Sequence, residues 1–209
     1  MGDQMTRDSQ PVSAPATKGI RIRWPRFYDA LNRIHFLGRE GLYREKTVDL
    51  AVITSGDHVL DVGCGTGNLT IAAKLRAGVE GQVYGIDAAP EMVREAERKA
   101  AAKQLEIRFQ VGLIEALDLP DDEFDVVLSS LMLHHLPKDL KQRGIAEIAR
   151  VLKPGGRFLA VDVDPWLLKN LETVEEAMRT AGFREIQRGR TGFKTVWIPI
   201  HYLGGRIDS

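Results

Sequence analysis

Apolar and polar positions alternate along the middle of the chain in a way that predicts a sheet interleaved with helices. Short runs rich in Val, Ile and Leu are separated by longer amphipathic stretches. The predicted strands are 58–62, 81–87, 106–111, 124–130 and 157–163, and the predicted helices between them are 68–78, 90–104 and 139–152. Strands that alternate with helices favour an α/β fold with a parallel sheet covered on both faces.

The two ends of the chain depart from this alternation. Two helices are predicted first, over 27–37 and 38–53, and the first would carry its apolar side chains on one face that packs on the sheet edge. That face consists of Phe27, Leu31, Ile34 and Leu37. The later predicted elements are a helix over 165–180 and strands over 183–191 and 194–203, with a hairpin turn at Thr191–Gly192 that would pair the two strands antiparallel.

The stretch VLDVGCGTG, residues 59–67, follows the first predicted strand and precedes a predicted helix. Gly63, Gly65 and Gly67 permit backbone angles and a close approach that a Cβ atom would obstruct. The N-terminus of the following helix faces the same point, at the carboxyl end of the strand, where open α/β sheets bind ligands. The loop therefore predicts a nucleotide-like cofactor; the alternative is that the glycines only form a tight turn.

Two carboxylates narrow the choice of cofactor. Asp87 ends the second predicted strand, where a carboxylate accepts both ribose hydroxyls of either NAD or an adenosine cofactor. The glycine spacing is G-x-G-x-G, whereas the dinucleotide fingerprint is G-x-G-x-x-G. Asp61 would repel a pyrophosphate and attract the α-ammonium group of S-adenosylmethionine. S-adenosylmethionine is thus favoured, and an NAD-linked oxidoreductase is the alternative.

The motifs together resemble a known family. VLDVGCGTG, GIDAAPEM, LPDDEFDVVLSSLMLHHL and ARVLKPGGRFLAVD resemble the successive motifs of class I S-adenosylmethionine-dependent methyltransferases, and most of all the ubiquinone/menaquinone C-methyltransferase branch. The resemblance covers roughly residues 27–164. It implies a Rossmann-like seven-stranded sheet, mostly parallel with an antiparallel last strand, and helices on both faces.

The residue pattern and the resemblance together indicate how the chain is divided, and the first 19 residues have almost nothing to bury. We expect a flexible tail over 1–19 and a single methyltransferase domain over 20–209. Within that domain we expect an N-terminal helical lid over 20–54, a cofactor-binding core over 55–164, and a terminal helix and strand pair over 165–209.

Site residues are carried over by matching the motifs position by position. The implied cofactor contacts are Asp61, Gly63, Cys64 and Gly65 at the methionine part, Gly67 at the turn into the helix, Asp87 at the ribose hydroxyls, Ala88 and Met92 near ribose and adenine, Gly112, Leu113 and Ile114 beside adenine, Ser129 and Ser130 on the methionine side, and Tyr28 from the lid. Cys64 contributes its backbone in this interpretation rather than a reactive thiol.

One position departs from the family pattern. Many relatives have an acidic residue where Leu113 stands, and that acid accepts a hydrogen bond from the adenine amino group. An unpaired buried donor costs about 1–3 kcal/mol. Either a backbone carbonyl supplies the acceptor or cofactor affinity is lower, and Glu115, two residues on, is oriented either toward the site or away from it.

Methyl transfer from a sulfonium requires positioning more than acid–base chemistry, because the sulfur leaves as a neutral thioether. A base is needed only for an acceptor that loses a proton, and His134 is the candidate for that role. The alternative is that His134 or His135 packs in the loop or caps a helix. No metal site is predicted, because two adjacent histidines should point apart and no ligand cluster accompanies them.

Composition limits the partners. Lys and Arg together number 29, as do Asp and Glu, so the formal net charge is zero and a nucleic-acid substrate is not expected. Cys64 is the one cysteine, and no signal peptide or membrane-spanning run is apparent, so we expect a cytoplasmic protein without stable membrane insertion. The sequence carries no signal for an oligomeric state.

The leading hypothesis is methyl transfer to a small-molecule acceptor. The lack of a long insertion after residue 163 favours an apolar acceptor such as a quinone precursor or a lipid. A non-catalytic S-adenosylmethionine-binding protein is the alternative from another functional class. The basic, aromatic segment 20–39 favours a lid packed on the domain, with docking on a membrane surface as the alternative.

Overall fold

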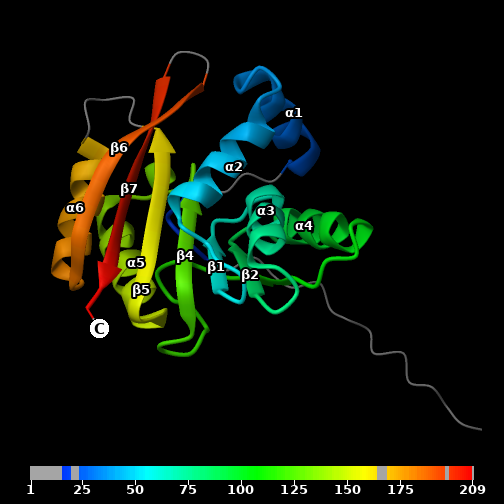
Figure 1. Ribbon diagram of the computed structural model, residues 1–209. Coiled ribbons are helices and arrows are strands. Elements are labelled where there is room, and N and C mark those ends of the chain that lie inside the picture. The colour runs from blue at the N-terminus through cyan, green and yellow to red at the C-terminus, as the bar shows by residue number, and fades with distance from the viewer. Residues whose placement is uncertain (1–15, 20–23, 164–168, 196–197, 209) are drawn as a thin grey trace, which may run out of the picture.

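A seven-stranded sheet forms the centre of the protein (Figure 1). The computed structural model describes residues 16–19, 24–163, 169–195 and 198–208. The strands are β1 (His58–Val62), β2 (Gln82–Asp87), β3 (Arg108–Val111), β4 (Phe124–Ser130), β5 (Leu152–Val163), β6 (Phe183–Thr195) and β7 (Ile198–Ile207). The helices are α1 (Pro25–His35), α2 (Glu40–Leu50), α3 (Asn68–Ala77), α4 (Pro90–Ala102), the 3₁₀ turn η1 (Leu133–His135), α5 (Lys138–Val151) and α6 (Lys169–Thr180).

The strand order is β3-β2-β1-β4-β5-β7-β6. The first five strands along the sheet pair in parallel, and β7 pairs antiparallel with both β5 and β6. This confirms the predicted fold class, a mostly parallel Rossmann-like sheet with an antiparallel last strand and helices on both faces. No helix in the described part of the chain is long and apolar enough to cross a membrane.

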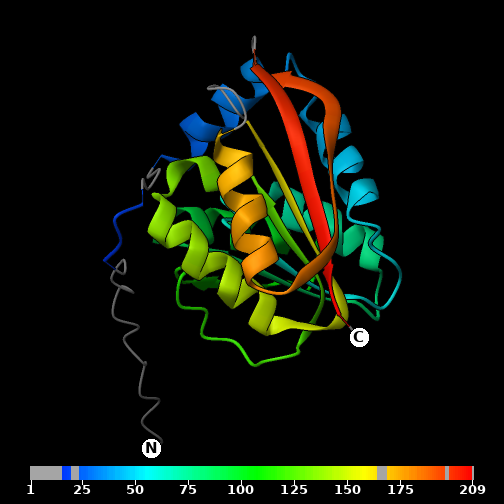
Figure 2. The ribbon, with the colours of Figure 1, turned by 90° about the vertical axis from the view of Figure 1, so that its left-hand side faces the viewer.

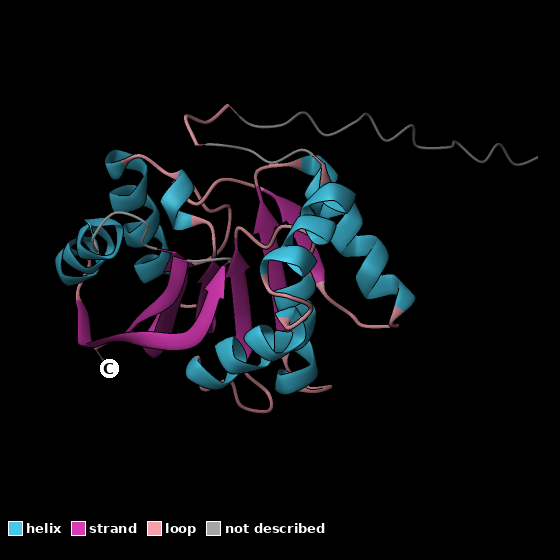
Figure 3. Ribbon diagram, turned by 90° about the horizontal axis from the view of Figure 1, so that it is seen from above, coloured by secondary structure: helices cyan, strands magenta, loops and turns pink. Residues whose placement is uncertain are grey.

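Two apolar layers sandwich the sheet, because successive side chains of a strand point to opposite faces. Leu60 and Val62 of β1 belong to the core beneath α5 and α6, whereas Val59 belongs to the core beneath α2 and α3. Figure 2 shows α5 and α6 together on one face, and Figure 3 shows the helices on both sides of the strands. The same alternation turns Asp61 toward α3.

The order of the sheet reverses at β1, which lies between β2 and β4. The chain leaves β1 toward α3 on one face and leaves β4 toward α5 on the other. This creates a crevice at the carboxyl ends of β1, β2 and β4, where α/β sheets bind ligands. α1 lies at this end of the sheet (Figure 1).

The predicted hairpin turn at Thr191–Gly192 is wrong, although the antiparallel pairing is right. β6 continues to Thr195, and the strands are joined through residues 196–197, which lie outside the described residues. Gly192 has φ +86° and lies where the β6–β7 register shifts between Arg190 and Lys194. The glycine therefore permits an irregularity within β6. The sequence alone does not distinguish such an irregularity from a turn.

The predicted packing of α1 is also wrong. Phe27 is 65% exposed, Ile34 is 68% exposed and Leu37, just after the helix, is 85% exposed. The helix instead presents its other face to the domain, where Tyr28 and Asn32 line a pocket. Polar contacts, described below, orient this helix in place of apolar packing.

Candidate active site at the carboxyl end of the sheet

The glycine loop between β1 and α3 has the backbone that the sequence predicts. Gly63, Gly65 and Gly67 all have positive φ, at 75°, 53° and 76°. A Cβ atom on Gly67 would lie 2.7 Å from the Cβ atom of Ala96 in α4, so the loop and α4 approach as closely as the missing side chain permits. Tyr28 lies over the loop, because a Cβ on Gly65 would be 3.7 Å from its ring.

Two adjoining pockets follow this loop. They share Tyr28, Gly63, Gly65 and Leu131, so the two pockets meet along the loop. The first pocket is lined also by Thr17, Gly19, Val62, Ile86, Asp87, Ala88, Met92, Gly112, Leu113, Ile114, Glu115, Met132, His135 and Leu136. The second is lined also by Asn32, Phe36, Glu40, Tyr43, Arg44, Asp61, Cys64, Thr66, Asn68, Leu69 and Ser130.

Asp87 ends β2 on the floor of the first pocket. Its Oδ1 accepts a hydrogen bond from the backbone N–H of Ala89 at 2.8 Å, and its Oδ2 accepts one from Gly65 at 2.9 Å. These bonds fix the carboxylate and leave each oxygen a lone pair for a ligand hydroxyl. Burial raises the pKa of Asp87, and the two backbone bonds partly oppose that shift.

Asp61 lies deeper, on β1, and is 1% exposed. Its Oδ2 accepts a hydrogen bond of 2.7 Å from the hydroxyl of Thr70 in α3. Burial raises the pKa of Asp61 from 3.8 to about 7, and the nearby charge of Asp87 adds to the increase. Ionised Asp61 is therefore costly in the ligand-free protein.

The electrostatics of the two carboxylates favour a cationic ligand. Among the described residues, neither Asp61 nor Asp87 is paired with a lysine or an arginine. Two buried carboxylates that raise each other's energy are stabilised by an incoming positive charge and destabilised by an incoming pyrophosphate. This feature separates a sulfonium amino acid from a dinucleotide more sharply than the glycine spacing does.

The far end of the first pocket has an apolar wall with one carboxylate. Leu113 lines it, as predicted, and has no side-chain acceptor. Glu115 lines it too, and its Oε1 accepts a hydrogen bond of 3.1 Å from the hydroxyl of Thr17. The structure thus turns Glu115 toward the site, an orientation that the sequence left open. It also places Thr17 and Gly19, from the segment predicted as a tail, in the lining of this pocket.

The end of β4 contributes one serine to the site. Ser130 lines the second pocket, and its hydroxyl lies 2.7 Å from the hydroxyl of Tyr43 in α2. Burial raises the pKa of Tyr43, so this phenol stays protonated. Ser129 is 2% exposed and lines neither pocket, because alternate residues of a strand face opposite ways.

The two histidines after β4 lie together rather than pointing apart, so that expectation is wrong. Their ring centroids are 3.9 Å from each other. His134 Nδ1 lies 2.6 Å from Oδ1 of the buried Asp162, whose Oδ2 accepts the backbone N–H of His134 at 2.9 Å. His135, not His134, lines the first pocket, and burial lowers its pKa, so its ring is neutral at neutral pH.

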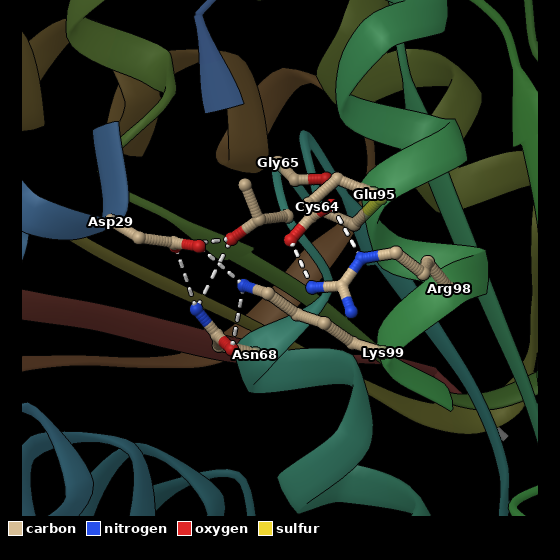
Figure 4. A network of polar contacts seen from close by, with 8 residues as sticks. Asp29, Cys64, Gly65, Asn68, Glu95, Arg98 and Lys99 are labelled. Atoms are coloured by element: carbon tan, nitrogen blue, oxygen red, sulfur yellow. Dashed lines mark hydrogen bonds and ion pairs between the residues drawn. The ribbon is translucent and has the colours of Figure 1, made fainter. Parts of the chain in front are cut away.

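A polar network fastens α1 over the glycine loop (Figure 4). Asp29 of α1 accepts hydrogen bonds from the Thr66 hydroxyl at 2.7 Å, from Asn68 Nδ2 at 3.0 Å and from Lys99 Nζ of α4 at 2.6 Å. Lys99 Nζ also donates to Asn68 Oδ1 at 3.0 Å. We call these four residues the α1 latch.

Asp29→Asn is expected to loosen α1 and weaken ligand retention, because it removes the charge that three donors share. Charged hydrogen bonds contribute about 1.5–3 kcal/mol, and partial exposure reduces that figure here. We expect amide hydrogen exchange to increase in α1 and cofactor dissociation to become roughly threefold to tenfold faster. Arg143→Ala, which removes an exposed ion pair with Asp139 on α5, is the control and should change neither quantity. Unchanged α1 exchange in Asp29→Asn would show that the latch does not hold the helix.

Most predicted site residues meet in this crevice. The predicted residues that line the two pockets are Tyr28, Asp61, Gly63, Cys64, Gly65, Asp87, Ala88, Met92, Gly112, Leu113, Ile114 and Ser130. Gly67 acts at the turn instead, and the Cys64 thiol is buried with a raised pKa. Sequence reasoning missed Asp29 and Asp162, since nothing local distinguishes them from other carboxylates.

Comparison with known proteins identifies the domain. Residues 59–156 match a family model described as a methyltransferase domain. Over this stretch the chain is similar to methyltransferase domains. The demethylmenaquinone methyltransferase of Thermus thermophilus is 38% identical over 139 residues, which cover 66% of this chain and 61% of the relative. That of Deinococcus radiodurans is 40% identical over 138 residues, 66% of this chain and 56% of the relative.

The names of the curated relatives belong to the branch that the motifs resemble. A ubiquinone/menaquinone biosynthesis C-methyltransferase of Marinomonas is 33% identical over 137 residues, 65% of this chain and 54% of the relative. The chain thus spans between 54% and 61% of the length of these three curated relatives. Among solved structures, a methyltransferase of Aquifex aeolicus shares the fold of the methyltransferase domain with a TM-score of 0.69 and 22% identity, over 86% of this chain and 97% of that one.

Proposed function

We propose that this chain transfers a methyl group from S-adenosylmethionine to a small apolar acceptor of the quinone-precursor type. The observation that carries the proposal is the pair of buried carboxylates, Asp61 and Asp87, at either side of the glycine loop without a cationic partner among the described residues. The names of the relatives support the acceptor class. The balanced charge of the chain supports a small molecule over a nucleic acid, and its single buried cysteine supports a cytoplasmic setting.

The residues present fit this cofactor from end to end. Asp61 would hold the α-ammonium group, Asp87 the two ribose hydroxyls, and Met92 with Ile114 the apolar faces of adenine. Tyr28 would cover the middle, where both pockets meet. When bound, the cofactor supplies an electrophilic methyl group on a sulfonium.

The protein's own contribution is positioning and exclusion of water. α1 closes over the glycine loop through the α1 latch, and such positioning accounts for about 7–11 kcal/mol in favourable cases. For an acceptor that loses a proton, we propose His135 as the base, because its neutral ring lines the pocket. His134 stays the alternative base: its Nδ1 is held by Asp162, which leaves Nε2 to accept a proton.

A calorimetric titration tests the cofactor directly. We expect S-adenosylmethionine to bind and NAD not to bind, because Asp61 would repel a pyrophosphate beside the glycine loop. Binding of NAD without binding of S-adenosylmethionine would overturn the proposal in favour of an oxidoreductase.

Glu115 is proposed as the acceptor for the adenine amino group in place of Leu113. Its carboxylate lines the adenine end of the pocket, and Thr17 occupies one of its oxygens. We expect the wild type to bind S-adenosylhomocysteine roughly tenfold more tightly than the deaminated inosine analogue, and Glu115→Leu to lose that preference.

Calorimetry with both analogues measures the ratio of the two affinities, which is insensitive to a general loss of binding. Leu113→Ala is the matched control on the same wall and should keep the ratio. If Glu115→Leu keeps the ratio as well, a backbone carbonyl is the acceptor.

A further inference from the structure

One face of α1 carries large apolar side chains that contact solvent. Phe27 and Ile34 are two helical turns apart and therefore lie one above the other. They are 65% and 68% exposed, and Trp24, at the start of the helix, is 73% exposed. With Leu37, just beyond the helix, these side chains form what we call the α1 apolar face.

The opposite face of the same helix contributes side chains to the site. Tyr28 and Asn32 line the second pocket, and Asp29 is the centre of the α1 latch. Tyr28 and Asn32 lie about 100–140° around the helix from Phe27, at about 100° per residue. α1 therefore cannot bury its apolar face on its own domain without withdrawing Tyr28 from the glycine loop.

The charged residues of the segment that carries this face are mostly of one sign. Between residues 20 and 39 the sequence has five arginines and a single acidic residue, Asp29, which is held in the latch. Arg33 and Arg39 are the two of these arginines whose side chains the structure describes, and both are exposed. An exposed apolar stripe with an aromatic residue at one end and arginines beside it matches the boundary of an anionic lipid bilayer.

We propose that the α1 apolar face docks the protein on an anionic lipid surface, so that an apolar acceptor enters the site beside α1 directly from the bilayer. The entry of an acceptor from the bilayer rests on the proposed function, whereas the docking itself does not. A second copy of the chain is a poorer occupant, because a symmetric contact would place two sets of arginines against each other. One short helix gives weak and reversible attachment, which suits an enzyme that returns to solution.

Sedimentation with lipid vesicles tests the docking without any assay of activity. We expect the wild type to sediment with vesicles of phosphatidylcholine and phosphatidylglycerol, and to do so less at high salt or with phosphatidylcholine alone. The double variant Phe27→Asp with Ile34→Asp should bind these vesicles roughly tenfold more weakly. The matched control is Leu75→Asp with Val79→Asp, which changes two side chains near the end of α3 that are 66% and 92% exposed and should bind like the wild type.

Two further readouts keep the outcomes distinct. Calorimetry with S-adenosylmethionine should give the same affinity for all three proteins, so a failure of docking is separable from a failure of the proposed function. Wild-type protein that stays in the supernatant with anionic vesicles, or a control that loses binding as much as the α1 variant, would overturn the docking. Light scattering without lipid could instead show that the wild type and the control are dimers and that the α1 variant is a monomer. That result would assign the face to a second copy of the chain.

Discussion

Asp61→Asn is expected to stabilise the ligand-free protein at neutral pH while it weakens cofactor binding. The folded-state pKa of Asp61 is raised from 3.8 to about 7, so the unfolded chain loses this proton at lower pH than the folded chain. The contribution of this group to stability is therefore complete below pH 3.8 and is lost as the pH rises toward 7. Three units of pKa correspond to about 4 kcal/mol, which is the upper bound on the gain from the substitution.

The asparagine keeps one oxygen for the Thr70 hydroxyl, removes the charge and replaces the other oxygen with an NH2 donor. Urea unfolding at pH 5 and at pH 8 should give a stability difference between the variant and the wild type that is larger at pH 8. A difference that does not change with pH would show that Asp61 does not titrate in this range.

We expect the same charge to control binding. Wild-type affinity for S-adenosylmethionine should increase up to tenfold per pH unit below about pH 7 and level off above it, because the ammonium group requires ionised Asp61. Asp61→Asn should bind roughly tenfold to a hundredfold more weakly at pH 8 and lose this pH dependence. Calorimetry over the pH range measures both, and Asp49→Asn, which changes an exposed carboxylate of α2, is a control that should behave as the wild type does.

Gly67→Ala is expected to destabilise the fold by about 2–5 kcal/mol. The left-handed backbone at φ +76° costs an alanine about 1–2 kcal/mol, and a contact of 2.7 Å with the Cβ of Ala96 forces α4 and the loop apart for about 1–3 kcal/mol more. Gly56→Ala is the matched control, because Gly56 has φ +88° and nothing within 4 Å of an added Cβ. Gly56→Ala should lower the free energy of unfolding only by the backbone contribution of about 1–2 kcal/mol.

Urea unfolding of both variants measures the difference, which isolates the close packing of the loop against α4. Cofactor affinity should also fall in Gly67→Ala and not in Gly56→Ala. Equal destabilisation by the two substitutions would mean that the loop can shift away from α4 with no further loss of stability. Its geometry would then not be fixed by α4.

The parts of the fold that sequence predicts well are those with local signals. The period of two in the core strands, the glycines after β1 and the acid at the end of β2 each depend on a few adjacent residues, so the residue pattern is enough to locate Asp61, Asp87 and the loop. Leu113 and Ile114 follow β3 for the same reason, since the end of a strand fixes which residues reach the crevice.

The features that sequence does not predict depend on contacts between distant elements. The residue pattern predicts that the apolar face of α1 packs inward, and the preference reverses because Asp29 finds three donors on the loop and α4. Asp162 becomes important only because β5 brings it beside His134. The role of Gly192 could not be predicted from the sequence even within one strand, since a glycine permits a bulge as readily as a turn.

Transfer of a labelled methyl group tests the central claim most directly. Purified protein, methyl-labelled S-adenosylmethionine and a cell extract would be separated after reaction into lipid, small polar, protein and nucleic-acid fractions. We predict label in the lipid fraction with the wild type and, at a cofactor concentration below saturation, roughly tenfold to a hundredfold less with Asp61→Asn. Label confined to a polar or macromolecular fraction would contradict the acceptor, and no label anywhere despite confirmed cofactor binding would contradict the enzyme itself.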